Sequence, residues 1–183
     1  KSGLGVGIFK GNPASIQLAG DTGYIQDSAF STTDDGNDGG IDFTTANDAL
    51  LVGVHNGVFF IDGTTSKPTF ANSVAASATF GTNPNTNSTD GVAFVNDDPD
   101  QEYVVKADAA VGQAIFGLCG NINDFAAGDA KDGASTATFD SGTQAETKMF
   151  RIVRSAEDPD NEDLTAAGAN IIVVINAAAN TYR

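Results

Sequence analysis

Two acidic turns carry the side chains best suited to chemistry in this sequence. Each places an Asp-Pro-Asp step between apolar stretches, one at Asp97–Asp100 and one within Ser155–Leu164. Carboxylates are hard oxygen ligands of the kind that divalent cations prefer, so a metal site is one hypothesis. Its candidate ligands are Asp97, Asp98, Asp100, Asp158 and Asp160. The alternative is structural, because proline fixes φ and an Asp side chain bonds its own backbone in turns. We favour the structural interpretation and assign no metal.

A second acidic stretch, residues 31–48, looks like a calcium-binding loop. Gly36 and Thr45 stand where an EF-hand needs its second ligand and its final bidentate ligand, so the pattern fails. We expect a solvated acidic loop.

Side chains for covalent or acid–base catalysis are scarce. The sequence has one histidine, His55, and one cysteine, Cys119, and it contains no G-x-S-x-G nucleophile elbow. His55 is expected to be structural, and Cys119, in an apolar run, to be a small buried hydrophobe. The glutamates that could pair for sugar hydrolysis are Glu102, Glu146, Glu157 and Glu162. Three of the four adjoin acidic turns, where exposure would keep them ionised, and no tryptophan is present to stack on a sugar. We predict neither an enzyme nor a cofactor.

The charge balance limits the partners. The 183 residues include 24 acidic and 9 basic side chains, for a formal charge of −15. Nucleic acids and anionic membranes need clustered Lys and Arg, which this sequence lacks. No apolar stretch reaches the length of a membrane span, and a lone cysteine permits no disulfide within the chain.

The composition favours strands and turns, with 21 glycines, 12 phenylalanines and much Val, Ile, Thr and Asn. We predict a β-hairpin over residues 49–62 with a type I′ turn at Asn56-Gly57. Further strands are expected at Thr136–Asp140, Phe150–Val153 and Ile171–Ile175, the last buried on both faces. Residues 1–12, with three early glycines, read as an extended arm or edge strand.

These elements predict one all-β domain over residues 1–183, an antiparallel barrel or sandwich with long loops. Both strand–Asp-Pro-Asp–strand units are expected to form hairpins in its core sheet.

The order of several segments resembles a family of small virion structural proteins of tailed phages, of the cyanophage and marine-phage type. The segments are LLVGVHNGVFFID, TTSKPTFANS, DGVAFVNDDPDQEYVVKADA and KMFRIVRSAEDPDNEDLTAAGANIIVVIN. The family's two core units correspond here to Asp97–Asp108 and Phe150–Asn176, and GVGIFKGNPASI is similar to its opening.

The resemblance implies a non-enzymatic cement or decoration protein on the capsid exterior, with the major capsid protein as its partner. Such proteins gain avidity from many symmetric copies, and a homo-oligomer, a trimer at local three-fold axes, is expected. The residues expected to contact the shell are Lys1, Leu4, Val6, Ile8, Phe9 and Lys10. Two alternatives stay open: a tail or baseplate component, and a secreted calcium-dependent module that binds glycan or surface polymer.

Overall fold

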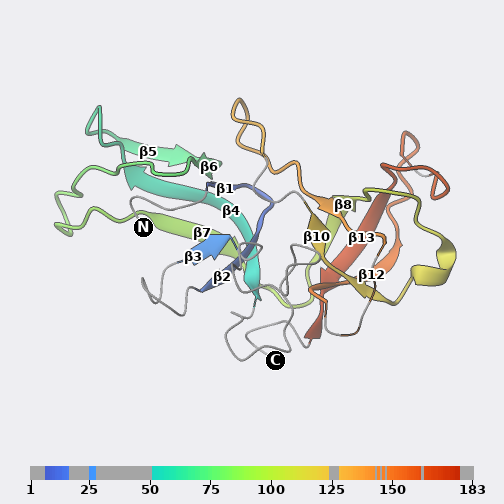
Figure 1. Cartoon of the computed structure of the whole chain (residues 1–183). Helices are drawn as coiled ribbons and strands as arrows, with labels where there is room; N and C mark the ends of the chain where they lie inside the picture. The colour runs from blue at the N-terminus through green and yellow to red at the C-terminus, as the bar shows by residue number, and fades with distance from the viewer. Residues whose placement is uncertain are drawn as a thin grey trace.

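The computed structural model describes residues 7–16, 25–27, 51–123, 128–142, 144, 146, 148–161 and 163–177. The described part of the chain is built from strands, with a single 3₁₀ turn, η1 (Gln113–Ile115), as its helical element. Every strand-to-strand ladder is antiparallel, which confirms the predicted all-β class (Figure 1). The strands are β1 (Ile8–Phe9), β2 (Pro13–Ile16), β3 (Ile25–Asp27), β4 (Leu51–Ile61), β5 (Pro68–Ala71), β6 (Ser73–Val74), β7 (Val92–Asn96), β8 (Glu102–Lys106), β9 (Cys119–Gly120), β10 (Ile122–Asn123), β11 (Thr138–Phe139), β12 (Phe150–Ser155) and β13 (Asn170–Ile175).

The first sheet is organised around β4, the longest strand. One edge of β4 pairs with β2 along its first half and with β5 along its second half. The other edge pairs with β7, and β3 lies outside β2. Figure 1 shows β4 curving through this half of the molecule with β5 and β7 on either side. Beneath it packs a small core of Ile8, Val58, Val74 and Phe80.

The predicted hairpin at Asn56-Gly57 is wrong, because β4 runs straight through it. The register on β7 shifts between His55, opposite Val95, and Gly57, opposite Phe94. Asn56 is therefore the extra residue of a β-bulge. Gly57 has φ +135°, so the positive φ that a type I′ turn would use serves the bulge instead. Non-local pairing on both edges keeps the strand continuous, and no local pattern reveals those partners.

The second sheet has the order β8-β13-β12-β9 and covers the larger core. β13 lies between two neighbours, and Ile171, Ile172, Val173 and Ile175 are buried, as the continuous apolar run predicted. Around it pack Phe139, Met149, Phe150 and Ile152, together with Leu51 from β4. The first residue of β4, the central strand of the first sheet, is therefore buried in the core of the second sheet.

The two Asp-Pro-Asp units differ in topology. The second joins β12 to β13, which pair with each other, so it is the expected hairpin within the core sheet. The first joins β7, which pairs with β4, to β8, which pairs with β13. It is a crossing between the two sheets, and the prediction of a hairpin is wrong there. Figure 1 shows β7 in one half of the molecule and β8 in the other.

Candidate functional site

The two Asp-Pro-Asp units form the same turn. At the first, Asp98 Oδ1 accepts the backbone N–H of Asp100 at 2.9 Å, and the Asp98 carbonyl accepts Gln101 N–H at 3.2 Å. The second repeats both bonds: Asp158 Oδ1 accepts Asp160 N–H at 3.1 Å, and the Asp158 carbonyl accepts Asn161 N–H at 2.9 Å. The first aspartate of each step therefore holds the turn closed, which is the structural role that the sequence favoured.

The second turn is also tied to the sheet. Asp158 Oδ2 accepts a hydrogen bond from Asn170 Nδ2 at 2.7 Å, at the start of β13. The bonds from the Asp160 backbone and from Asn170 hold the pKa of Asp158 below its usual value. Among the described residues, no group of three His, Cys, Asp or Glu side chains is placed to hold a metal ion. The remaining candidate ligands, Asp97, Asp100 and Asp160, are exposed at the two turns.

The expected shell-contact segment is partly built into the fold. Lys1, Leu4 and Val6 lie outside the described residues. Ile8 is only 4% exposed, because it pairs with β6 and packs in the small core. Phe9 is half-buried, and Lys10 is exposed.

The backbone of Lys10 is also fixed in place. It donates to Gly133 at 3.0 Å and accepts from Ser135 at 2.8 Å. Of the two expectations for this segment, the edge strand is confirmed at Ile8–Phe9, which pairs with β6, and the free arm is wrong for residues 7–12. Ile8 is withdrawn as a shell contact because its side chain lies inside the protein.

His55 is a core residue of β4 and is only 1% exposed. Its Nδ1 lies 3.2 Å from the carbonyl oxygen of Phe9, and its backbone exchanges bonds with Gly11 and Asn12 at 2.8 and 2.9 Å. Burial lowers the pKa of His55, with the hydrogen bonds to the backbone of Phe9 and Gly57 acting in the opposite direction. The neutral ring of His55 joins the β1–β2 turn to β4, so its role is structural, as expected. The residue lies within a strand, however, and not beside a hairpin turn.

Cys119 on β9 is buried, as the sequence predicted. Burial raises the pKa of its thiol, which therefore stays protonated and unreactive near neutral pH.

An exposed apolar row crosses the outer face of the first sheet. Phe59 on β4 lies directly opposite Phe70 on β5 and Val92 on β7, so the three side chains share one face. Phe94 follows two residues after Val92 and completes what we call the aromatic row. Phe70 is 61% exposed, Val92 58% and Phe94 45%. The rings of Phe70 and Phe94 stand 5.6 Å apart at 50°.

The aromatic row is reinforced at the bulge. A side chain on Gly57 would begin 2.7 Å from Cζ of Phe70, so the ring lies over the glycine backbone. Contiguous apolar side chains that stay exposed mark interaction sites more often than single exposed residues do. Sequence reasoning missed this row because it depends on which strands flank β4. Residues 92–95, VAFV, are apolar throughout, so the local sequence does not show which of these side chains face outward.

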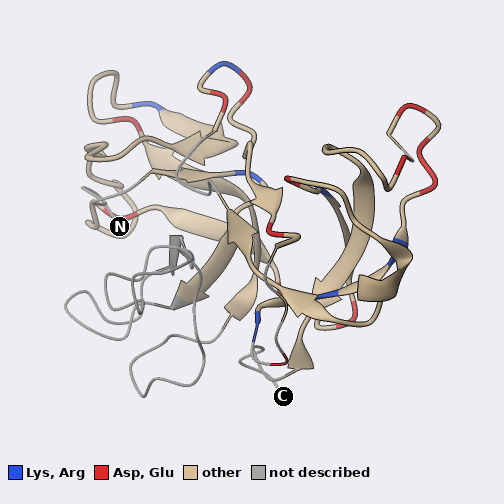
Figure 2. Cartoon of the chain, turned by 45° about the vertical axis from the view of Figure 1, so that its right-hand side comes forward, with Lys and Arg blue, Asp and Glu red and all other residues tan. Residues whose placement is uncertain are grey.

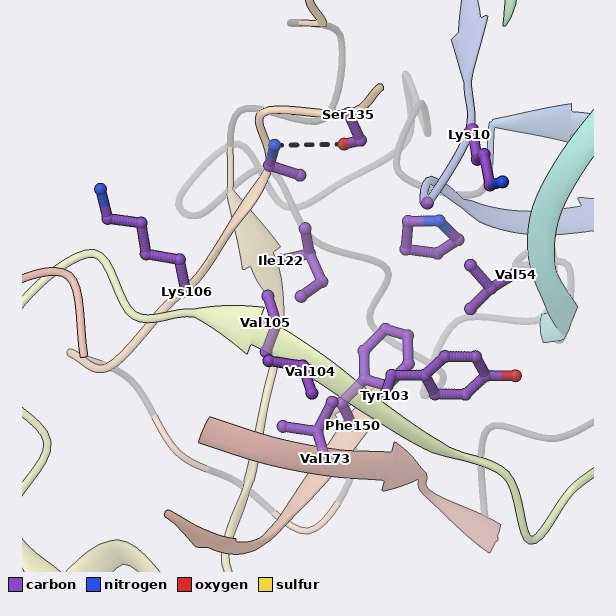
Figure 3. Close-up of a pocket in the computed structure, with 13 residues that line it drawn as sticks. Lys10, Val54, Tyr103, Val104, Val105, Lys106, Ile122, Ser135, Phe150 and Val173 are labelled. Atoms are coloured by element: carbon purple, nitrogen blue, oxygen red, sulfur yellow. Dashed lines mark hydrogen bonds between the residues drawn. The ribbon is translucent and has the colours of Figure 1, made fainter. Parts of the chain in front are cut away.

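A groove of about 310 Å³ lies between the two sheets. Figure 3 shows β8 running along it, with Lys10 and Val54 on one side and Lys106 on the other. The lining mixes polar and apolar groups, and its apolar walls are formed by Val54, Tyr103, Val105, Ile122, Phe150 and Val173. Tyr103 donates its hydroxyl to the carbonyl of Asn96 at 3.2 Å, which fixes its ring in the wall. Burial and the nearby Asp98 and Asp97 carboxylates raise the pKa of Tyr103 to about 12, so the phenol stays protonated.

Acidic residues of the described chain lie mostly in the loops at the ends of the strands (Figure 2). Within the described residues, no helix is long and apolar enough to cross a membrane.

Comparison of the chain with protein-family models, with curated proteins and with solved structures found no match.

Proposed function

We propose that this chain is a non-enzymatic structural protein of a phage particle, a cement or decoration protein that binds the outer face of the head and stabilises it. The observation that carries the proposal is the aromatic row, an apolar surface left open across three strands of a chain with a formal charge of −15. A highly acidic protein that keeps such a surface uncovered is suited to bury it against a partner. The resemblance of Asp97–Asp108 and Phe150–Asn176 to phage virion proteins suggests that the partner is the major capsid protein.

The apolar area of the aromatic row indicates how many copies must bind together. From their exposed fractions, Phe70, Val92 and Phe94 can bury roughly 300 Å² together, which at about 25 cal/mol per Å² is roughly 7 kcal/mol. Association itself costs about 4–15 kcal/mol, so one row holds a single copy only weakly. A homo-oligomer, which we propose to be a trimer at local three-fold positions, would engage several rows at once and gain avidity.

The negative charge of the chain explains how the free protein could stay soluble before it binds a shell. Repulsion between copies of charge −15 keeps the free protein from associating with itself, while a shell would bring the copies together by geometry. The two proline turns, each closed by its own aspartate, stabilise the crossing and the hairpin without a partner.

The experiment compares serine variants of the exposed apolar side chains for binding to capsids stripped of the protein. Phe70→Ser and Phe94→Ser each remove roughly 100 Å² of apolar contact, worth about 2–3 kcal/mol, and should weaken binding roughly 30- to 150-fold. Leu118→Ser is the matched control, because Leu118 is 46% exposed but lies outside the row. Wild-type protein that does not bind capsids would overturn the proposal, and binding that both row variants retain in full would overturn the docking face.

A further inference from the structure

The free edge of the second sheet adjoins the inter-sheet groove. β8 is the last strand of that sheet and pairs with β13 along one edge. Ala107 donates to the carbonyl of Ala169 at 2.9 Å, and bonding direction alternates along an antiparallel ladder, so Val105 and Tyr103 also bond β13. The backbone N–H and C=O of Val104 therefore point outward. No strand in the part of the chain that the structure describes pairs with them.

A second segment approaches β8 and then separates from it. Ala107 and Phe139 form a parallel bridge, and Asp108 donates to the Phe139 carbonyl at 3.0 Å. Upstream of this bridge, Ser135 and Ala137 line the same groove as β8 (Figure 3). The groove thus opens where the two segments stop bonding each other, beside backbone groups that no described strand bonds.

The edge has only part of the usual protection against strand pairing. Natural edge strands are blunted by short length, charged side chains, proline, bulges or a covering loop, and β8 has the first two. β8 contains neither proline nor a register shift, and at its centre stands Val104, which is 65% exposed. The side chains of Glu102 and Lys106 flank it at the two ends of the strand. An exposed valine on an open edge is what a strand acceptor presents.

The charged side chains beside the groove are basic, whereas the chain as a whole is strongly acidic. Lys10 and Lys106 both line the groove and are both exposed, although basic side chains number only 9 in the sequence. Neither ammonium group forms an ion pair with a described residue; the ion pair that the described residues do show joins Arg154 to Glu102 at 3.2 Å. Figure 3 shows Lys106 extending away from the groove, with its Nζ toward Gly168, so Lys10 is the lysine that can meet a carboxylate beside this lining of mixed polarity.

We propose that the groove binds an extended segment of a partner protein, which adds to β8 as a further strand. Its backbone would bond the outward groups of Val104, its alternate apolar side chains would enter the groove, and a carboxylate at its end would meet Lys10. Strand addition supplies affinity through the main chain and specificity through alternate side chains. The proposal does not depend on the aromatic row, which lies on the other sheet. Residues 1–6 contain no acidic side chain, so this segment is a poor match to Lys10.

The probe is a synthetic peptide of alternating valine and threonine with a glutamate at each end. The four β8 residues that line the groove span roughly 13 Å at about 3.3 Å per residue, so a peptide of about seven residues suffices. Binding is measured by fluorescence anisotropy, and its location by amide chemical-shift changes in the labelled protein. Saturable binding with shifts at Tyr103–Lys106 is expected. A glutamate-to-lysine peptide and a peptide N-methylated on its bonding edge should each bind at least tenfold more weakly.

Val104→Pro is the decisive protein variant. The Val104 N–H is not part of the β13 ladder, so proline removes a donor for the partner while leaving the sheet's own bonds in place. It should weaken peptide binding at least tenfold, whereas Phe70→Ser should leave it unchanged.

Four outcomes would overturn the proposal. They are the absence of saturable binding, equal affinity for the lysine-ended peptide, equal affinity for the N-methylated peptide, and shifts located on the aromatic row. The peptide comparisons need only the wild-type protein, so they decide the matter even if Val104→Pro does not fold. If the chain alone forms a dimer and Val104→Pro makes it monomeric, the edge binds a second copy of this chain instead, and the proposal is also wrong.

Discussion

Replacing Gly53 with alanine tests how β4 and β7 are joined. Gly53 is buried on β4, and a methyl group there would overlap the carbonyl oxygen of Asn96 and lie 2.8 Å from Cγ1 of Val95. Asn96 is the last residue of β7, directly before the turn that carries the chain to the second sheet. The methyl group can be accommodated only if the end of β7 moves away from β4.

The expected cost follows from two effects. Overpacking at a rigid backbone costs about 1–3 kcal/mol, and a displaced ladder bond about 0.5–1.5 kcal/mol. Restriction of the unfolded chain by alanine offsets about 0.4–1 kcal/mol, which leaves a loss of about 0.5–4 kcal/mol, centred on about 2 kcal/mol. For a chain of this size the midpoint falls about 2–4 °C per kcal/mol, so the central value corresponds to a drop in Tm of roughly 4–8 °C.

Gly112→Ala is the matched control. A Cβ on Gly112 meets nothing within 4 Å, and its φ of −70° and ψ of 150° suit alanine. This variant should match the wild type or gain up to about 1 kcal/mol. Thermal and urea unfolding of both variants provide the measurement. A Gly53→Ala protein as stable as the control would refute the close approach of β4 and β7 and, with it, the continuous central strand.

Three further predictions concern buried titratable groups. Because burial lowers the pKa of His55, the unfolded state takes up the proton first, so stability should fall as pH drops below about 6.5. Urea unfolding between pH 7.5 and 5.5 measures the loss, and a His55→Gln variant with the same slope would contradict its assignment to His55. Tyr103, one of three tyrosines, should ionise near pH 12, and stability should fall as pH rises above about 10, where the unfolded phenol loses its proton. Absorbance titration should show this late step, and its persistence in Tyr103→Phe would exclude Tyr103 as the source. Cys119 should react with a maleimide slowly in the folded protein and fast in urea, whereas rapid labelling of folded protein would show that β9 opens readily.

The locally encoded parts of this fold could be predicted from the sequence. Asp-Pro-Asp turns close through an aspartate and its own backbone, so both were foreseeable from a few residues. The same holds for β13, whose unbroken apolar run requires burial on both faces.

The non-local parts could not be predicted. Asn56-Gly57 suits a turn and a bulge equally, and only the strands on both edges of β4 decide between them. The early glycines suggested an arm, yet a side chain on Gly7 would begin 3.0 Å from the carbonyl oxygen of Val74, so close packing explains that glycine. The aromatic row exists because Phe70 and Val92, far apart in sequence, both lie opposite Phe59.

The most direct test of the proposed function is the number of copies that bind a phage head. Purified protein would be sedimented with expanded capsids from which it has been stripped, and the bound copies counted at saturation. The proposal predicts on the order of hundreds of copies per particle, as symmetric shell sites require. Saturation at about a dozen copies or fewer would assign the protein to the portal, tail or vertices. The absence of binding would contradict the capsid proposal and favour the calcium-dependent surface-binding module.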